Sequence, residues 1–101
     1  MTIKYNSMAT HLIADDDGVH GVKYKENGKT KEVSAKAVVL ASGGFQANVE
    51  WRTRYLGPNW DLAKVRGTRF NTGMGHEMAF AVGAQATGHW SGCHAVGWEL
   101  N

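Results

Sequence analysis

A serine and two glycines that follow an apolar run are the first candidates for chemistry. Ser42, Gly43 and Gly44 come directly after residues 37–41, which read AVVLA. Ligands of open α/β sheets bind beyond the carboxyl ends of the strands, and glycine removes side chains from the path of a flat or phosphorylated ligand. We therefore predict a cofactor contact at these three residues, and a plain tight turn is the alternative interpretation.

A second glycine-containing segment, residues 71–75, reads NTGMG and precedes a predicted helix. Free N–H groups and the helix dipole favour an anionic or polar ligand at such a helix start. Gly73 and Gly75 would let that ligand reach the backbone, and Thr72 is a candidate for binding the substrate. The same letters also fit a glycine-containing helix entry with Thr72 as its cap.

Two arginines and a histidine are further candidates for binding a carboxylate substrate. Arg66 and Arg69 lie three residues apart just before the second glycine segment. A guanidinium group grips a carboxylate with a bidentate fork, whereas an ordinary solvated arginine is the alternative. His94 could bind a substrate carboxylate or transfer a proton.

The single cysteine and the histidine spacing argue against a metal centre. The chain has no CxxC or HxxxH spacing, so we predict no metal site; a site formed by His89, Cys93 and His94 is the alternative. One cysteine cannot form an intrachain disulfide, which fits a reducing compartment. No apolar run approaches the roughly 20 residues that span a bilayer. We expect a soluble, cytoplasmic protein.

Strands predominate among the elements expected in the first half of the chain. Short alternating runs, separated by DDDG at residues 15–18 and by Asn27-Gly28, predict a three-stranded antiparallel meander over residues 10–35. The apolar residues 37–41 predict a strand buried on both faces, as in an α/β sheet.

Helices are expected in the second half. Asn48 as N-cap and Gly57-Pro58 as the stop predict a helix over residues 49–56. A second helix is predicted over residues 74–82, with Gly83 just past its end. Its buried face would comprise Gly75, Met78, Ala79 and Val82. For residues 85–101 a strand is the mildly favoured prediction.

Composition restricts the class of protein. Of 101 residues, 43% are hydrophobic and 20% are charged, which argues against intrinsic disorder. The net charge of +2 is weak and the basic residues are dispersed, so a nucleic-acid partner is not expected. The length suffices for one small domain at most.

Taken in order, these segments resemble flavoproteins of the fumarate reductase and succinate dehydrogenase family. Residues 37–45, AVVLASGGF, resemble the family's AVVLATGGF; residues 71–75 resemble its TGDG element; and residues 81–85, AVGAQ, resemble a helix end of the family. Residues 65–70, VRGTRF, and residues 89–94, HWSGCH, are most similar to the tricarballylate dehydrogenase subgroup.

The resemblance implies an FAD-dependent oxidoreductase that acts on a carbon–carbon bond of a di- or tricarboxylate. It implies that Ser42, Gly43 and Gly44 lie against the FAD, and that Gly73 and Gly75 lie near the flavin and the substrate. The flavin would carry the redox chemistry, while the protein orients the reactants.

The same resemblance implies that His94 contacts a substrate carboxylate, with residues 1–47 in the FAD-binding domain and residues 48–101 beginning the substrate-capping region. Two departures stand out. Met74 replaces the family's aspartate, and the sequence lacks the G-x-G-x-x-G turn that holds the FAD pyrophosphate. We therefore expect a mixed α+β incomplete domain, a fragment that is inactive alone and binds FAD weakly or not at all.

An incomplete sheet also predicts self-association. The strand over residues 37–41 would expose open edges, so we expect a dimer or higher oligomer. The alternative to the flavoprotein interpretation is a stand-alone α/β interaction module without catalysis.

Overall fold

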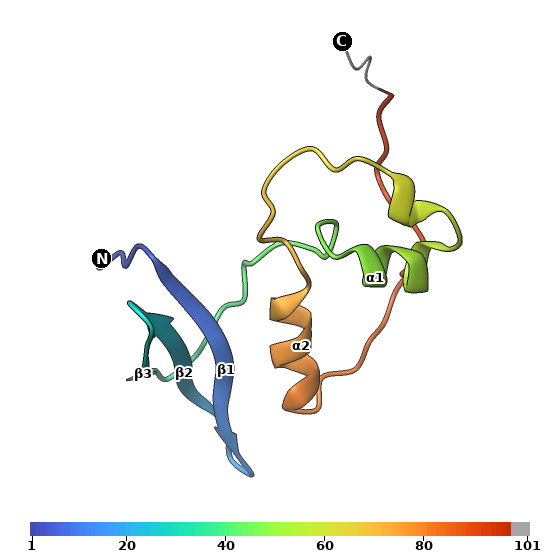
Figure 1. The fold of residues 1–101 in the computed structure, drawn as a ribbon. Helices are drawn as coiled ribbons and strands as arrows, with labels where there is room; N and C mark the ends of the chain where they lie inside the picture. Colours follow the sequence, from blue (N-terminus) through green and yellow to red (C-terminus); the bar gives the residue numbers. More distant parts are fainter. Residues whose placement is uncertain (98–101) are drawn as a thin grey trace.

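Three antiparallel strands form the first part of the computed structural model, which describes residues 1–97. Strands β1 (Ser7–Asp15), β2 (Gly18–Glu26) and β3 (Lys29–Ser34) pair in the order β1-β2-β3. The predicted meander is confirmed, although β1 begins earlier than residue 10. Figure 1 shows the sheet on one side of the molecule and the helices on the other.

Local turn chemistry explains the two hairpins. Asn27 and Gly28 have φ angles of 50° and 75°, and these positive values match the twist of a tight hairpin. At the first turn, the backbone N–H of Asp17 donates to a carboxylate oxygen of Asp15 at 2.9 Å. The Asp15 side chain therefore stabilises the first turn, and the second turn uses two residues that tolerate positive φ angles.

Residues 37–41 do not form a strand, so this prediction is wrong. The segment pairs with no strand in the described part of the chain, and Val39 and Leu40 are 87% and 39% exposed. Figure 1 shows it running as an open connection from the sheet to α1. An apolar run becomes a buried strand only when neighbouring strands supply hydrogen bonds and cover both faces.

The first helical segment begins where the sequence predicts. The side chain of Asn48 accepts a hydrogen bond from the N–H of Trp51 at 3.1 Å and caps α1 (Val49–Trp51). The helix continues as a π-helical turn, η1 (Arg52–Leu56), and ends at Gly57 with φ of 120°. A 3-10 helix, η2 (Trp60–Leu62), follows in a stretch for which no element is predicted.

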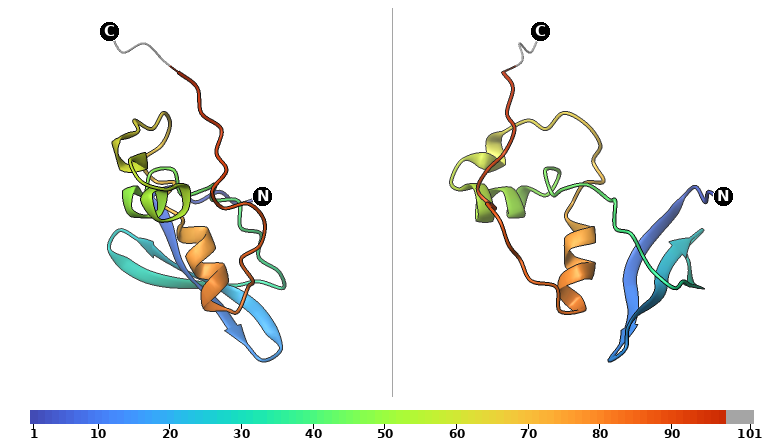
Figure 2. Two further views of the ribbon diagram at one scale, coloured as in Figure 1. Left: turned by 90° about the vertical axis from the view of Figure 1, so that its right-hand side faces the viewer. Right: turned by 180° about the vertical axis from the view of Figure 1, so that it is seen from behind.

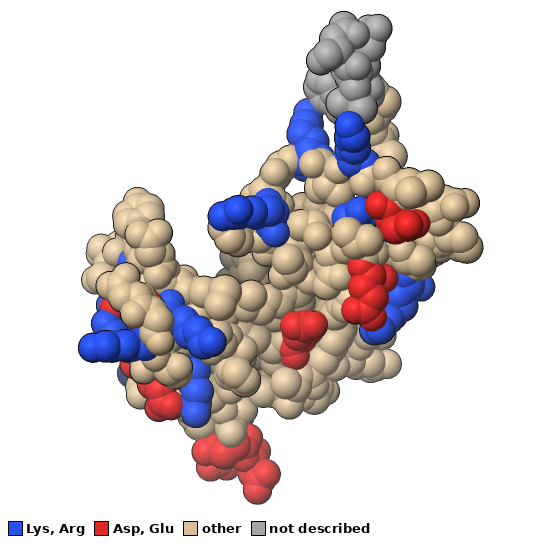
Figure 3. Space-filling model, viewed as in Figure 1, with Lys and Arg blue, Asp and Glu red and all other residues tan. Residues whose placement is uncertain are grey.

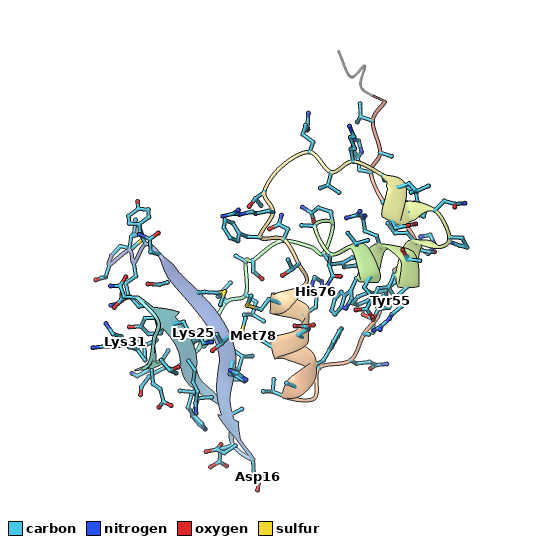
Figure 4. All side chains as sticks on the ribbon, viewed as in Figure 1. Asp16, Lys25, Lys31, Tyr55, His76 and Met78 are labelled. Atoms are coloured by element: carbon cyan, nitrogen blue, oxygen red, sulfur yellow. The ribbon has the colours of Figure 1, made fainter. Side chains whose placement is uncertain are left out.

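Helix α2 (Met74–Ala81) packs against β1 and is the main link between the sheet and the helices. The right view of Figure 2 shows α2 beside the sheet, the left view shows the two overlapping, and Figure 4 shows Met78 between α2 and β1. Gly75 and Met78 are buried and Ala79 is half-buried, as predicted. Val82, however, lies at the end of the helix and is exposed, so its place in the buried face is wrong.

The predicted strand in the tail is also wrong over residues 85–97, which contain no strand. The remainder of that prediction, residues 98–101, lies outside the described residues. Trp90 instead anchors the tail: its indole N–H donates to the carbonyl of Thr87 at 3.0 Å, and its ring stacks on that of Phe45. Within residues 1–97, no helix combines the length and apolarity needed to cross a membrane.

Charged groups are paired across the strands rather than gathered in one large patch. Figure 3 shows acidic side chains at the tip of the sheet and lysines above them, and Asp16 marks that tip in Figure 4. The carboxylate of Glu26 accepts hydrogen bonds from Lys31 in β3 and from Ser7 in β1, and Lys4 lies 3.7 Å away. The hydrogen bond from Lys31 holds the pKa of Glu26 below its ordinary value of 4.5.

We predict that Lys31→Met raises the pKa of Glu26 toward 4.5. Because the folded-state pKa is lowered, the carboxylate stabilises the fold above the unfolded value, and this contribution is lost as the pH falls through the folded-state pKa. A carbon-13 NMR titration of the Glu26 carboxyl measures the shift. Lys25→Met removes the same charge from an exposed β2 side chain and should leave the titration unchanged. A Glu26 that already titrates at its ordinary value in the unmodified protein would contradict the prediction.

Candidate functional site

The two glycine-containing segments lie against each other. We call residues 42–44 the first glycine loop and residues 71–75 the second glycine loop. The N–H of Gly73 donates to the carbonyl of Gly44 at 3.2 Å, and the N–H of Ala47 donates to the carbonyl of Asn71 at 2.8 Å. The side-chain amide of Asn48 adds a bond to the carbonyl of Thr72 at 3.0 Å. The fold thus unites two segments that the sequence keeps apart.

The missing side chains of the second glycine loop make room for the protein itself. A Cβ on Gly73 would come within 2.5 Å of the Trp51 ring and 3.1 Å of the Phe45 Cβ. A Cβ on Gly75 would overlap the hydroxyl of Ser42. Both glycines are buried. Internal packing therefore requires glycine at these two positions, whether or not a ligand also lies near.

The first glycine loop offers the surface on which a flat ligand could lie. Ser42 and Gly43 are exposed and Gly44 is half-buried. Gly43 has φ of 75°, and a Cβ there would approach the side-chain amide of Asn71 to 3.0 Å. Exposed backbone without side chains fits the requirement of an aromatic, phosphorylated cofactor such as FAD. The fit rests on this loop, because the second glycine loop faces inward.

An aromatic cluster lies beneath both glycine loops. Its rings come from the first turn after loop one, from α1 and η1, from α2 and from the tail: Phe45, Trp51, Tyr55, His76, Phe80 and Trp90. Contacting ring centroids are 5.0 to 6.4 Å apart. Figure 4 shows Tyr55 and His76 in the space between α1 and α2. Trp51 and Tyr55, four residues apart, share one face of the helical segment, with ring centroids 5.5 Å apart.

His76 is a site residue that the sequence does not single out. Its ring lies 5.5 Å from that of Trp90, and its Nδ1 is buried with no hydrogen-bond partner among the described residues. A buried imidazole nitrogen normally has a partner. The signal in the sequence is weak: His76 directly follows Gly75 and lies four residues before Phe80, on the same helical face.

Arg52 is the second residue that the sequence does not reveal, because its neighbour Arg54 looks equivalent by type. Arg52 is 6% exposed, and its guanidinium donates only to backbone carbonyls. Arg54 is exposed and pairs with Glu50 on the surface of the helix. Tertiary contacts with distant carbonyls therefore distinguish the two arginines, which are alike in type.

The predicted substrate-binding residues are placed less tightly than the glycines. Arg66, Arg69 and His94 are exposed, and Thr72 is half-buried within the second glycine loop. The guanidinium of Arg69 lies 5.0 Å from the centroid of the Phe70 ring. Within residues 1–97, no recorded hydrogen bond or ion pair joins Arg69 or His94 to a glycine loop. Their role in binding a substrate stays a prediction.

The metal alternative finds no geometric support in the part of the chain that the structure describes. No group of three His, Cys, Asp or Glu side chains there is arranged to hold an ion. The His89 ring instead contacts the Ser91 hydroxyl at 2.8 Å, and Cys93 is an exposed free thiol.

Met74, at the position of the family's aspartate, lines a groove between α2 and β1 together with Met78.

Comparison with known proteins gives a consistent picture. A family model described as an FAD binding domain matches residues 1–92. The urocanate reductase of Eggerthella lenta is 42% identical over 84 residues, which are 78% of this chain and 14% of that protein. The chain therefore spans about one-seventh of the curated relative.

Two solved structures share the fold. The 3-ketosteroid-Δ4-(5α)-dehydrogenase of Rhodococcus jostii RHA1, in complex with 4-androstene-3,17-dione, has a TM-score of 0.74 and 31% identity, covering 81% of this chain and 17% of its own. The 3-ketosteroid Δ1-dehydrogenase of Sterolibacterium denitrificans, in complex with 1,4-androstadiene-3,17-dione, has a TM-score of 0.72 and 31% identity. The match covers 78% of this chain and 15% of that protein.

We predict that Gly73→Ala destabilises the fold more than Gly83→Ala. The two glycines have φ angles of 89° and 91°, so alanine would suffer the same left-handed backbone strain at either position. Only Gly73 faces the Trp51 ring, whereas the space around Gly83 is open. Overpacking should therefore cost a further 1–3 kcal/mol, roughly. Urea denaturation followed by tryptophan fluorescence measures the difference; equal losses in both variants would show that close packing is unimportant here.

Proposed function

The chain belongs to the family of FAD-binding domains, and from this premise we propose that the first glycine loop contacts the cofactor of a flavin-dependent oxidoreductase. One observation carries the proposal: the backbone hydrogen bond from Gly73 to Gly44, which joins the two glycine loops. This bond holds the end of the loop that carries the exposed residues Ser42 and Gly43 against the second glycine loop.

The roles of the chain's residues in this proposal are binding and orientation. FAD supplies the acceptor or donor of a hydride, which no side chain can provide. Backbone groups of Ser42 and Gly43 would lie against it. Gly73 and Gly75 would act indirectly, since they allow the second glycine loop and the Trp51 ring to pack closely behind the first glycine loop.

The proposed substrate is a di- or tricarboxylate whose carbon–carbon bond gains or loses hydrogen, as in tricarballylate dehydrogenase. The curated relative is named for reducing urocanate, and urocanate is an unsaturated carboxylate; the solved structures are named as ketosteroid dehydrogenases. We assign the carboxylates to Arg66, Arg69, Thr72 and His94. Guanidinium groups suit that chemistry because they bind carboxylates with two parallel hydrogen bonds.

We further propose that activity requires polypeptide beyond these 101 residues. The described part buries few hydrophobic side chains: Tyr24, Trp51 and Met78. The radius of gyration is 16.0 Å, whereas a compact domain of this length has about 13 Å. The exposed apolar segment over residues 37–41 offers an edge to further strands, either of the same protein or of a second copy.

We predict that FAD binds this chain weakly and at the first glycine loop. In a titration with millimolar FAD followed by nitrogen-15 NMR, amide shifts should concentrate at residues 42–44 and spare the sheet tip at residues 16–18. Ser42→Glu should weaken these shifts, since it adds bulk and negative charge beside an anionic cofactor.

Ser34→Glu is the matched control, because Ser34 is also exposed but lies at the end of β3. It should leave the FAD titration unchanged. Shifts that map to the sheet tip, or an absence of shifts in the unmodified chain, would refute the cofactor site. Tight stoichiometric quenching of flavin fluorescence would refute the proposal that more polypeptide is needed.

We also predict that tricarballylate shifts the side-chain Nε–H signals of Arg66 and Arg69 in the same kind of titration. Arg69→Met should reduce the response at Arg66, because two guanidinium groups would share one ligand. Arg54→Met removes an equal charge from the exposed side of η1, where Arg54 pairs with Glu50, and should have no effect. A response that is the same in both variants would point to unspecific charge attraction instead.

A further inference from the structure

We propose that Arg52 is a positioning residue that sets the first glycine loop against the second. The effect of Arg52 on FAD binding rests on the proposed function. Its effect on the geometry of the two loops does not require a cofactor. Arg52 is the buried charged residue of the described part of the chain. It does not touch the proposed cofactor surface, so it would act through the backbone that it binds.

The guanidinium of Arg52 joins two separate stretches of backbone. On one side, Nη1 donates to the carbonyl of Gln46 at 2.7 Å. On the other side, Nε donates to the carbonyl of Trp60 at 2.9 Å, and Nη2 reaches the carbonyls of Asp61 and Ala63 at 3.3 and 3.4 Å. A planar fork with five donors can serve both stretches at once.

The stretch that contains Gln46 is the one that carries the contacts between the loops. Gly44, two residues earlier, accepts the hydrogen bond from Gly73, and Ala47, one residue later, donates to Asn71. The N–H of Asn48 closes the turn onto the carbonyl of Phe45 at 2.8 Å. Arg52 therefore donates a hydrogen bond to the middle of this turn, and the residues at its two ends form hydrogen bonds with the second glycine loop.

Burial makes the hydrogen bonds of the Arg52 guanidinium strong and specific. No ion pair to Arg52 is recorded within residues 1–97, so the carbonyl dipoles of four residues stabilise the buried charge. Removing the fork would leave those carbonyls to find water or move, and both disturb the turn. A lysine keeps the charge but presents one compact ammonium, which cannot match the planar fork.

Hydrogen exchange of individual amides tests the proposal in the 101-residue chain. In Arg52→Met, the amides of Ala47 and Gly73 should exchange about tenfold faster, which corresponds to about 1.4 kcal/mol. Amides within α2 and β2 should keep their protection, since a positioning role acts on the turn alone. Arg54→Met, which removes an exposed guanidinium from the same helical segment, should change neither set.

Arg52→Lys decides the matter should Arg52→Met fail to fold. It should preserve protection in α2 and β2 but leave the amides of Ala47 and Gly73 at least a few-fold faster than in the unmodified chain. Unchanged exchange at these two amides, or an equal increase at every amide, would overturn the proposal. FAD titration of the unmodified chain tests the cofactor role alone. If FAD causes no shifts at residues 42–44, the cofactor role is refuted, whereas the exchange rates still test whether Arg52 positions the first glycine loop.

Discussion

The backbone hydrogen bond from Gly73 to Gly44 is the contact on which the arrangement of the helical part depends. It forms only because the second glycine loop carries no side chain where the Trp51 ring and the Phe45 Cβ approach it. Any larger residue would push the two loops apart. The glycines of this chain thus differ in purpose: Gly75 and Gly73 serve packing, whereas Gly43 keeps backbone exposed at the surface.

Two further devices stabilise that contact from either side. The aromatic cluster supplies a broad apolar base, and ring pairs such as Trp51 with Tyr55 meet edge to face, which is a favourable geometry. The guanidinium of Arg52 holds the turn by its carbonyls. Since the tail stacks Trp90 on Phe45, even the segment after α2 is tied to the same cluster. The sheet contributes chiefly through the packing of α2 on β1.

This organisation holds one exposed glycine loop, residues 42–44, against a buried glycine loop from a distant part of the chain. The match to the FAD-binding family over residues 1–92 covers both loops. The residues proposed to bind the substrate differ, because Arg69 and His94 lie exposed on irregular segments. Since neither residue lies in a glycine loop, binding of a carboxylate needs its own experiment.

Local chemistry in the sequence determined the hairpins and helix starts, since Asn27-Gly28 and the Asn48 cap act over a few residues. The resemblance of ordered motifs also pointed correctly to an FAD-dependent oxidoreductase family. Only the tertiary structure decided that residues 37–41 stay outside the sheet of β1, β2 and β3, that Arg52 rather than Arg54 is buried, and that His76 joins the aromatic cluster. Pairing and burial depend on partners far along the chain, and no local pattern specifies whether those partners are present.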